Sequence, residues 1–221
     1  LEAIDRIVGG LEKKNKLISI NEREIIAYHE AGHATVSWML EHAAPLIKVT
    51  IVPRGKSLGA AWYLPEERQL TTKEQIFDEM CAAMGGRAAE EIVFKKVSTG
   101  ALSDLEKITK QARAMIAFFG LNEKIGNVTY YDSSGQESIF TKPYSEHTAQ
   151  VIDEEIKKIT QKAYMTAKKI LEKNKKSLTK IANLLLEKEV IFKDDVELIL
   201  GKRKWKKEER MRVSQIKKND N

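Results

Sequence analysis

The sequence predicts a mainly α-helical domain that carries a small β-hairpin or sheet and ends in a helical hairpin. Only 7% of the 221 residues are aromatic, whereas 32% are charged, and Lys, Glu, Ala, Leu and Ile are abundant, a composition that favours helices. Apolar residues recur at helical spacing over most of the chain, and period-two alternation is confined to short stretches. With 42% hydrophobic residues, the chain can bury a sizeable core.

The first predicted helix covers residues 21–42. Asn21 is a good N-cap, with Glu24 in the capping-box position three residues later, and Pro45 follows closely enough to stop the helix. The apolar stripe of this helix includes two histidines and contains Ile25, Ile26, His29, His33, Val36 and Leu40.

Two short extended segments follow. In residues 46–52, apolar and polar residues alternate before a Pro-Arg-Gly turn breaks the pattern. Residues 57–64 end at Pro65, and their small side chains would let another backbone approach closely. We expect a hairpin or small sheet beside the first helix.

The second predicted helix begins at Thr72, with Gln75 completing a capping box, and continues to about Val93. The Gly85-Gly86 pair interrupts its pattern. Two glycines inside a helix cost roughly 1–2 kcal/mol against alanine, so we expect close packing or a break at this point.

A third predicted helix begins at Ser103, which pairs with Glu106 as a capping box, and ends at Gly120. Residues 125–131 are weakly strand-like, and the polar stretch up to Pro143 is typical of a loop.

The last third of the chain is predicted to be helical throughout. A long helix with one apolar stripe ends at Asn174, and two shorter helices, residues 177–189 and 194–200, fold back as a hairpin.

Charge and composition exclude several classes of function. The net charge of +6 is concentrated in residues 201–221, which we interpret as a basic, disordered tail, and no nucleic-acid-binding motif accompanies it. The single Cys81 forms no internal disulfide and fits a reducing compartment. No stretch reaches the roughly 18 apolar residues of a membrane span, and the missing initial Met suggests an excised fragment.

The motif His29-Glu30-Ala31-Gly32-His33 carries the chemistry. Histidines four residues apart on a helix point the same way and can bind one zinc ion. Glu30 is rotated by roughly 100° from His29, where it can act as a general base on a zinc-bound water. A structural zinc site is usually closed by four Cys or His ligands, and Cys81 alone cannot supply that set. We therefore predict a zinc endopeptidase.

A catalytic zinc needs a third protein ligand, and spacing alone leaves its identity open. The candidates are Glu90 and Glu91 on the second helix and Asp104 at the start of the third. Both glutamates could also be ordinary helix acids, and an acid in the first turn of a helix is stabilised by the helix dipole. His42 lies too far along the first helix, and His147 sits in a polar helix start.

Three segments are informative when they are taken together: residues 27–34 (AYHEAGHA), 85–91 (GGRAAEE) and 98–105 (STGALSDL). In this order they closely resemble the FtsH family of membrane-anchored, ATP-dependent zinc proteases. The resemblance implies that Asp104 is the third zinc ligand, although Ser103 replaces the Asn that often precedes it. Glu90 and Glu91 then support the site or remain alternative ligands.

The resemblance also implies an organisation and a set of partners. Residues 1–20 would link to a preceding ATPase module, 21–200 would form the zinc peptidase domain and 201–221 the tail. The strand of Gly59, Ala60, Ala61 and Trp62 would bind unfolded polypeptide by strand addition.

The expected assembly is a homo-hexamer that degrades unfolded, membrane or short-lived proteins and touches the membrane only through an N-terminal anchor. It would lie at the cytoplasmic face of a bacterial inner membrane or, alternatively, at the matrix side of the mitochondrial inner membrane.

Overall fold

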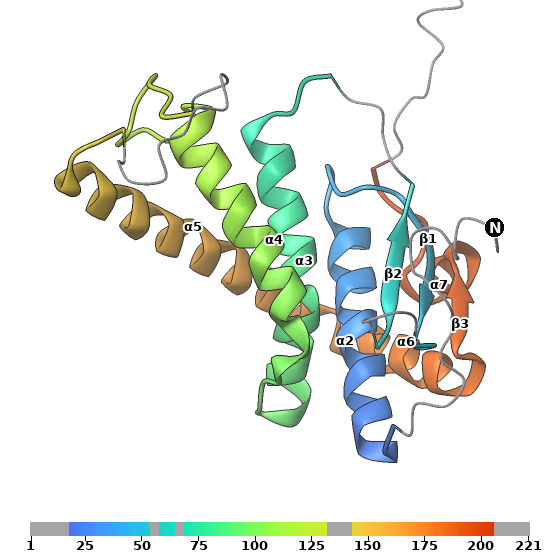
Figure 1. The fold of residues 1–221 in the computed structure, drawn as a ribbon. Helices are drawn as coiled ribbons and strands as arrows, with labels where there is room; N and C mark the ends of the chain where they lie inside the picture. The colour runs from blue at the N-terminus through green and yellow to red at the C-terminus, as the bar shows by residue number, and fades with distance from the viewer. Residues whose placement is uncertain (1–17, 54–57, 65–68, 132–142, 206–221) are drawn as a thin grey trace, which may run out of the picture.

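A long central helix, α2 (Ile20–Met39), lies between a small sheet and a layer of helices (Figure 1). The computed structural model describes residues 18–53, 58–64, 69–131 and 143–205. The expected mainly helical fold with a small sheet beside the first helix is confirmed. Most of the predicted linker and the tail beyond residue 205 lie outside the described residues.

The N-cap of helix α2 lies two residues earlier than predicted, and the helix ends at Met39 rather than at about residue 42. Its N-cap is Ser19, whose hydroxyl accepts from the Glu22 amide while the Glu22 carboxylate accepts from the Ser19 amide. The prediction of Asn21 and Glu24 was wrong because the same spacing of cap and acid occurs upstream. Every residue from Ile26 to Trp38 is buried, since α3 (Lys73–Phe94), α6 (Lys175–Lys188) and the sheet surround this helix.

The sheet has three antiparallel strands in the order β2-β1-β3. Strand β1 (Leu46–Thr50) pairs with β2 (Ala60–Tyr63) as predicted, and Val49 faces Ala61. The other edge of β1 pairs with β3 (Val190–Phe192), a strand that the sequence analysis missed. Within the described part of the chain, β2 is an edge strand.

Helix α3 runs without a break through Gly85 and Gly86, so the predicted interruption was wrong and the expected close packing is correct. A Cβ atom on Gly85 would lie 2.6 Å from the carbonyl oxygen of Gly32 on α2, and a Cβ on Gly32 would lie 2.3 Å from that of Gly85. The missing side chains therefore let the backbones of α2 and α3 touch.

Helix α4 (Leu102–Arg113) follows a 3₁₀ turn, η1 (Thr99–Ala101). The hydroxyl that caps this segment belongs to Ser98, which accepts from the Gly100 amide, so the predicted cap at Ser103 was wrong. A π-helical turn, η2 (Ala114–Phe118), continues α4, and Gly120 with φ of 63° ends it as expected.

Residues 125–131 form no strand, contrary to the prediction. They follow a turn in which the Asn122 side chain accepts from the Lys124 and Ile125 amides, and the Tyr130 amide donates to Ala117. Asn122 also donates to the buried carboxylate of Glu155, so the bonds of the Asn122 side chain and one backbone bond, rather than strand pairing, hold this segment.

Three helices complete the fold. Helix α5 (Glu146–Lys173) ends at Asn174 as predicted, and α6 begins directly after it. Helix α7 (Lys193–Leu200) follows β3, giving the expected C-terminal pair. Among the described residues, no helix combines the length and apolar character that crossing a membrane requires.

Candidate metal centre

Three side chains from two helices converge at one point. His29 and His33 project from α2, and Asp104 projects from the first turn of α4. Their ligand atoms all lie within 4.8 Å of one another. His29 Nε2 is 3.0 Å from His33 Nε2, and Asp104 Oδ2 is 3.3 Å from the first nitrogen and 3.5 Å from the second.

The outer nitrogen of each imidazole is held by its own acceptor. His33 Nδ1 donates to the carbonyl oxygen of Ala82 at 2.9 Å, and His29 Nδ1 donates to Glu90 Oε1 at 2.7 Å. A neutral histidine that donates from Nδ1 carries a lone pair on Nε2. Such hydrogen bonds to a carboxylate or a carbonyl are typical of histidines that ligate metals, since they fix the tautomer and the ring orientation.

This arrangement fits a cation. Two Nε2 lone pairs and one carboxylate oxygen face one another, and acceptors at these separations repel unless a positive charge lies between them. Two imidazoles and a carboxylate form a donor set that zinc prefers, with one position left for water or substrate. The residues present therefore fit a catalytic rather than a structural zinc ion.

The pKa shifts of His29 and Asp104 also support a cation at this point. Burial lowers the pKa of His29, but hydrogen bonds with Asp104 and Glu90 outweigh it and raise the pKa to about 10. Burial raises the pKa of Asp104, but hydrogen bonds with His29 and His33 hold it well below the usual range. The raised pKa of His29 reports the negative potential of the surrounding carboxylates, which also favours a bound metal cation. The lowered pKa of Asp104 shows that positive charge on the histidine side stabilises its carboxylate, and a metal cation would stabilise it in the same way.

Glu30 lies beside the convergence point and belongs to the same buried stretch of α2. Its burial raises its pKa, and the two neighbouring histidines oppose this shift. A Cβ on Gly59, just before β2, would lie 2.8 Å from Glu30 Oε1. Gly59 therefore leaves the space that the Glu30 carboxylate occupies.

Gly86 has a similar relation to His29, which the sequence analysis did not foresee. A Cβ on Gly86 would lie 2.4 Å from His29 Nε2 and 2.5 Å from the ring carbons Cδ2 and Cε1. The imidazole thus lies directly on the α3 backbone. The Gly85-Gly86 pair predicted close packing at this point of α3. That the packing partner is His29 depends on how α2 and α3 cross, which the sequence pattern does not show. The Ala82 carbonyl left no signal, since any residue type supplies one.

The convergence point opens into a cleft of about 1210 Å³ between α2, α3, α4 and β2. Gly59, Ala60 and Ala61 line it together with Tyr63. The Trp62 side chain does not line this cleft and instead lies under the Lys48 ammonium, 5.3 Å from the ring centroid.

The structure separates the two glutamates that the sequence left open. Glu90 is 2% exposed and joins His29 Nδ1 to the Ser98 amide, which donates to Glu90 Oε2 at 2.6 Å. Glu91 points away from the cleft and pairs with Tyr164 and Lys168 of α5. The group of possible metal ligands found among the described residues contains neither glutamate.

Comparisons with known proteins match this arrangement. The model of Peptidase family M41 matches residues 16–199. The chain is 62% identical over 205 residues to an ATP-dependent zinc metalloprotease FtsH from Parabacteroides distasonis, covering 93% of this chain and 30% of that protein.

Mitochondrial relatives are also similar. The chain is 49% identical over 216 residues to ATP-dependent zinc metalloprotease FTSH 10 of Arabidopsis thaliana, covering 97% of this chain and 26% of that protein. It is 48% identical over 202 residues to the mitochondrial inner membrane m-AAA protease component AFG3L2 of Mus musculus, covering 91% and 25%. The chain thus spans about a quarter to a third of these relatives, and it belongs to peptidase family M41.

Proposed function

We propose that this chain is the zinc endopeptidase part of an ATP-dependent, membrane-anchored protease. The observation that carries the proposal is the convergence of His29 Nε2, His33 Nε2 and Asp104 Oδ2 within 4.8 Å. These three atoms would hold zinc. When bound, zinc supplies a Lewis acid that polarises the peptide carbonyl and acidifies water.

The residues around this site have separate tasks in the proposed reaction. Glu90 and the Ala82 carbonyl hold the two imidazoles in the tautomer that directs Nε2 inward. Glu30 accepts a proton from the attacking water and returns it to the leaving amine. Its burial favours this role, since a raised carboxylate pKa brings the base nearer to neutral pH.

The proposed substrate is an extended, unfolded polypeptide that adds to β2 as a further strand. Two features support this: β2 is an edge strand in the described structure, and the small residues Gly59, Ala60 and Ala61 line the cleft beside Glu30. Backbone hydrogen bonds would supply most of the affinity, so sequence preference should be loose. N-methylation of the substrate amides that face β2 should weaken binding more than changes of side chain.

The wider setting follows from the relatives, whose names describe ATP-dependent zinc metalloproteases and an inner-membrane protease component. We infer that the full-length protein carries an ATPase module and a membrane anchor and forms a homo-hexamer. Its proposed location is the cytoplasmic face of a bacterial inner membrane, with the matrix side of the mitochondrial inner membrane as the alternative. Native mass spectrometry of the full-length protein would test the hexamer.

Two substitutions test the roles of Glu30 and Asp104. Glu30→Gln should retain zinc by metal analysis and lose casein cleavage, because the amide keeps the shape but accepts no proton. Asp104→Asn should lose most zinc, since a neutral amide oxygen is a much weaker ligand.

Glu91→Gln is the matched control, because Glu91 lies outside the cleft, and it should keep zinc. Casein cleavage by the Glu30 variant would refute the general base. A Glu91 variant that loses zinc while the Asp104 variant keeps it would restore the glutamate as the ligand.

A further inference from the structure

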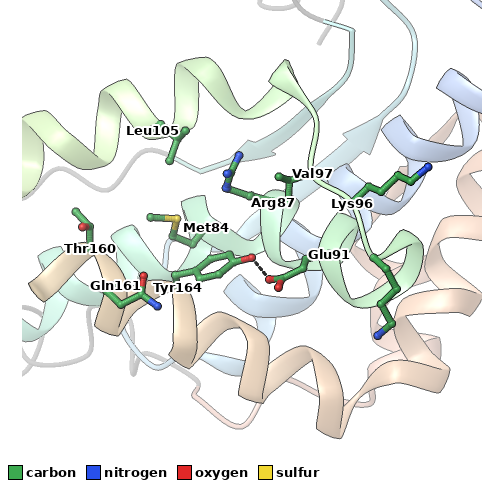
Figure 2. A pocket seen from close by; sticks show the side chains of 10 residues that line it. Met84, Arg87, Glu91, Lys96, Val97, Leu105, Thr160, Gln161 and Tyr164 are labelled. Carbon is green, nitrogen blue, oxygen red and sulfur yellow. Dashed lines mark hydrogen bonds between the residues drawn. The ribbon is translucent and has the colours of Figure 1, made fainter. Parts of the chain in front are cut away.

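A second cavity of about 460 Å³ lies between α3, the start of α4 and α5. Figure 2 shows its lining, with Met84, Arg87 and Glu91 on α3, Leu105 on α4 and Tyr164 on α5. Its volume is within the range of ordinary ligand pockets. None of the residues assigned above to zinc or to the reaction lines it.

This cavity lies behind the metal cleft and shares its walls. On α3, Glu90 faces the cleft and Glu91 faces the cavity. On α4, Asp104 faces the cleft and Leu105 faces the cavity. Adjacent residues of a helix point in directions roughly 100° apart, so each helix serves both spaces.

The lining carries an excess of positive charge. The Glu91 carboxylate is already engaged, since Tyr164 donates to it and Lys168 lies 3.1 Å away. Arg87 makes no hydrogen bond or ion pair with any other residue that the structure describes, and its charge adds to the hydrogen bonds from Tyr164 and Lys168 that lower the pKa of Glu91. Lys95 and Lys96 follow the end of α3, where positive charges also offset the helix dipole.

Arg87 is the cation best placed to bind a ligand. It is half-buried and extends from α3 towards Val97 and the segment that carries Leu105, whereas Lys96 extends away from it (Figure 2). A guanidinium presents parallel N–H groups that match a carboxylate or a phosphate in a bidentate manner.

The rest of the lining distinguishes between these two anions. Met84, Val97 and Leu105 present apolar surface to the cavity, and the Tyr164 ring forms part of its wall. A phosphate would leave this surface uncovered. A carboxylate attached to an apolar group would pair with Arg87 and also bury the apolar wall.

We propose that this cavity binds the free C-terminal carboxylate of a peptide that ends in an apolar residue. The choice of a peptide over another apolar carboxylate rests on the proposed function, because every cleavage of a polypeptide creates a new C-terminal carboxylate. The existence of a carboxylate site rests on the lining alone.

Titration of the zinc-loaded chain with small probes, followed by amide chemical shifts in NMR, tests the proposal. The probes are N-acetyl-alanyl-leucine, its C-terminal amide, N-acetyl-alanyl-glycine and inorganic phosphate. We expect the free acid to shift Val97, Leu105 and Tyr164 and to bind at least tenfold more tightly than the amide. The glycine acid and phosphate should bind more weakly, because neither covers the apolar wall.

Two variants locate the charge that is responsible. Arg87→Gln should abolish the preference for acid over amide, whereas Lys96→Gln removes one positive charge from the same lining and should keep it. If Arg87→Gln does not fold, Val97→Glu replaces it: this position is 44% exposed, and the new carboxylate should compete for Arg87 and block the probe.

Several results would overturn the proposal: equal binding of acid and amide, no binding of the acid, an unchanged preference in Arg87→Gln, or shifts confined to the metal cleft. Tighter binding of phosphate than of the leucine acid would assign the cavity to phosphate instead. A casein-cleavage assay on the same wild-type sample distinguishes failure of the carboxylate site from failure of the proposed endopeptidase function. Failure to cleave with intact probe binding would refute the proposed function and leave the carboxylate site.

Discussion

Gly86 provides the sharpest test of how the helices build the metal centre. Replacing it with alanine adds one methyl group at a position where His29 Nε2 lies 2.4 Å away. In an exposed helix this substitution would stabilise the protein by roughly 1 kcal/mol. In this protein we expect Gly86→Ala to weaken zinc binding, because the new Cβ atom overlaps the His29 imidazole.

The required displacement follows from the distances. Ordinary contact of a Cβ atom begins at about 3.4 Å, so Nε2 must retreat by about 3.4 − 2.4 = 1.0 Å. Zinc–nitrogen distances lie near 2.0–2.1 Å, and ligation tolerates deviations of only about 0.2 Å. His29 cannot retreat freely either, since its Nδ1 is bonded to the buried Glu90. We expect zinc affinity to fall by about 100-fold or more.

Competition with a chromophoric chelator would measure the affinity, and circular dichroism in excess chelator would measure the stability of the metal-free chain. Gly86→Ala should lose zinc while its metal-free stability changes little. Gly85→Ala is the matched comparison, because its Cβ meets the Gly32 backbone at 2.6 Å and should reduce stability itself. Zinc binding by Gly86→Ala at the wild-type affinity would show that the imidazole is not confined as described.

Two further predictions concern the base and the turn after α4. Gly59→Ala should retain zinc and lower kcat for a peptide substrate by about 100-fold, because the added Cβ displaces Glu30; an unchanged kcat would contradict this. Ion pairing with Lys124 and a hydrogen bond from Asn122 hold the pKa of Glu155 below its usual range despite some burial. Its stabilisation is therefore present above the unfolded pKa of about 4.3 and is lost as pH falls through the folded pKa. Chemical denaturation between pH 3 and 6 should show a shallower acid loss for Glu155→Gln, and identical slopes would refute the pairing.

The parts of the fold that depend on local pattern were predictable. The helices were found because apolar spacing and caps such as Thr72 with Gln75 lie within a few residues of one another. Strand β3 was missed because three residues give too little alternation, and it exists only through its pairing with β1. The supposed strand at 125–131 failed because Asn122 and Glu155, which lie 33 residues apart, fix that segment.

The candidate site divides in the same way. His29, Glu30 and His33 share one turn of one helix, so spacing alone could propose them. Asp104 could not be chosen over Glu90 or Glu91 from spacing, since all three depend on how α3 and α4 pack against α2. In the structure the two glutamates have different partners although they are adjacent on α3: Glu90 bonds to His29 beside the metal centre, and Glu91 faces α5.

The glycines of the two crossing helices explain why helix propensity is a poor guide at this site. Gly32, Gly85 and Gly86 together forgo roughly 3 kcal/mol of propensity relative to alanine. Each added Cβ would lie 2.3–2.6 Å from a backbone atom or from His29. The close crossing that the glycines permit brings α3 against α2, where Ala82 and Glu90 orient the two imidazoles. Alanine substitutions at these glycines would improve helix propensity, but they should weaken the protein or its metal site. The added side chains would push α2 and α3 apart or displace His29, and so move the metal ligands.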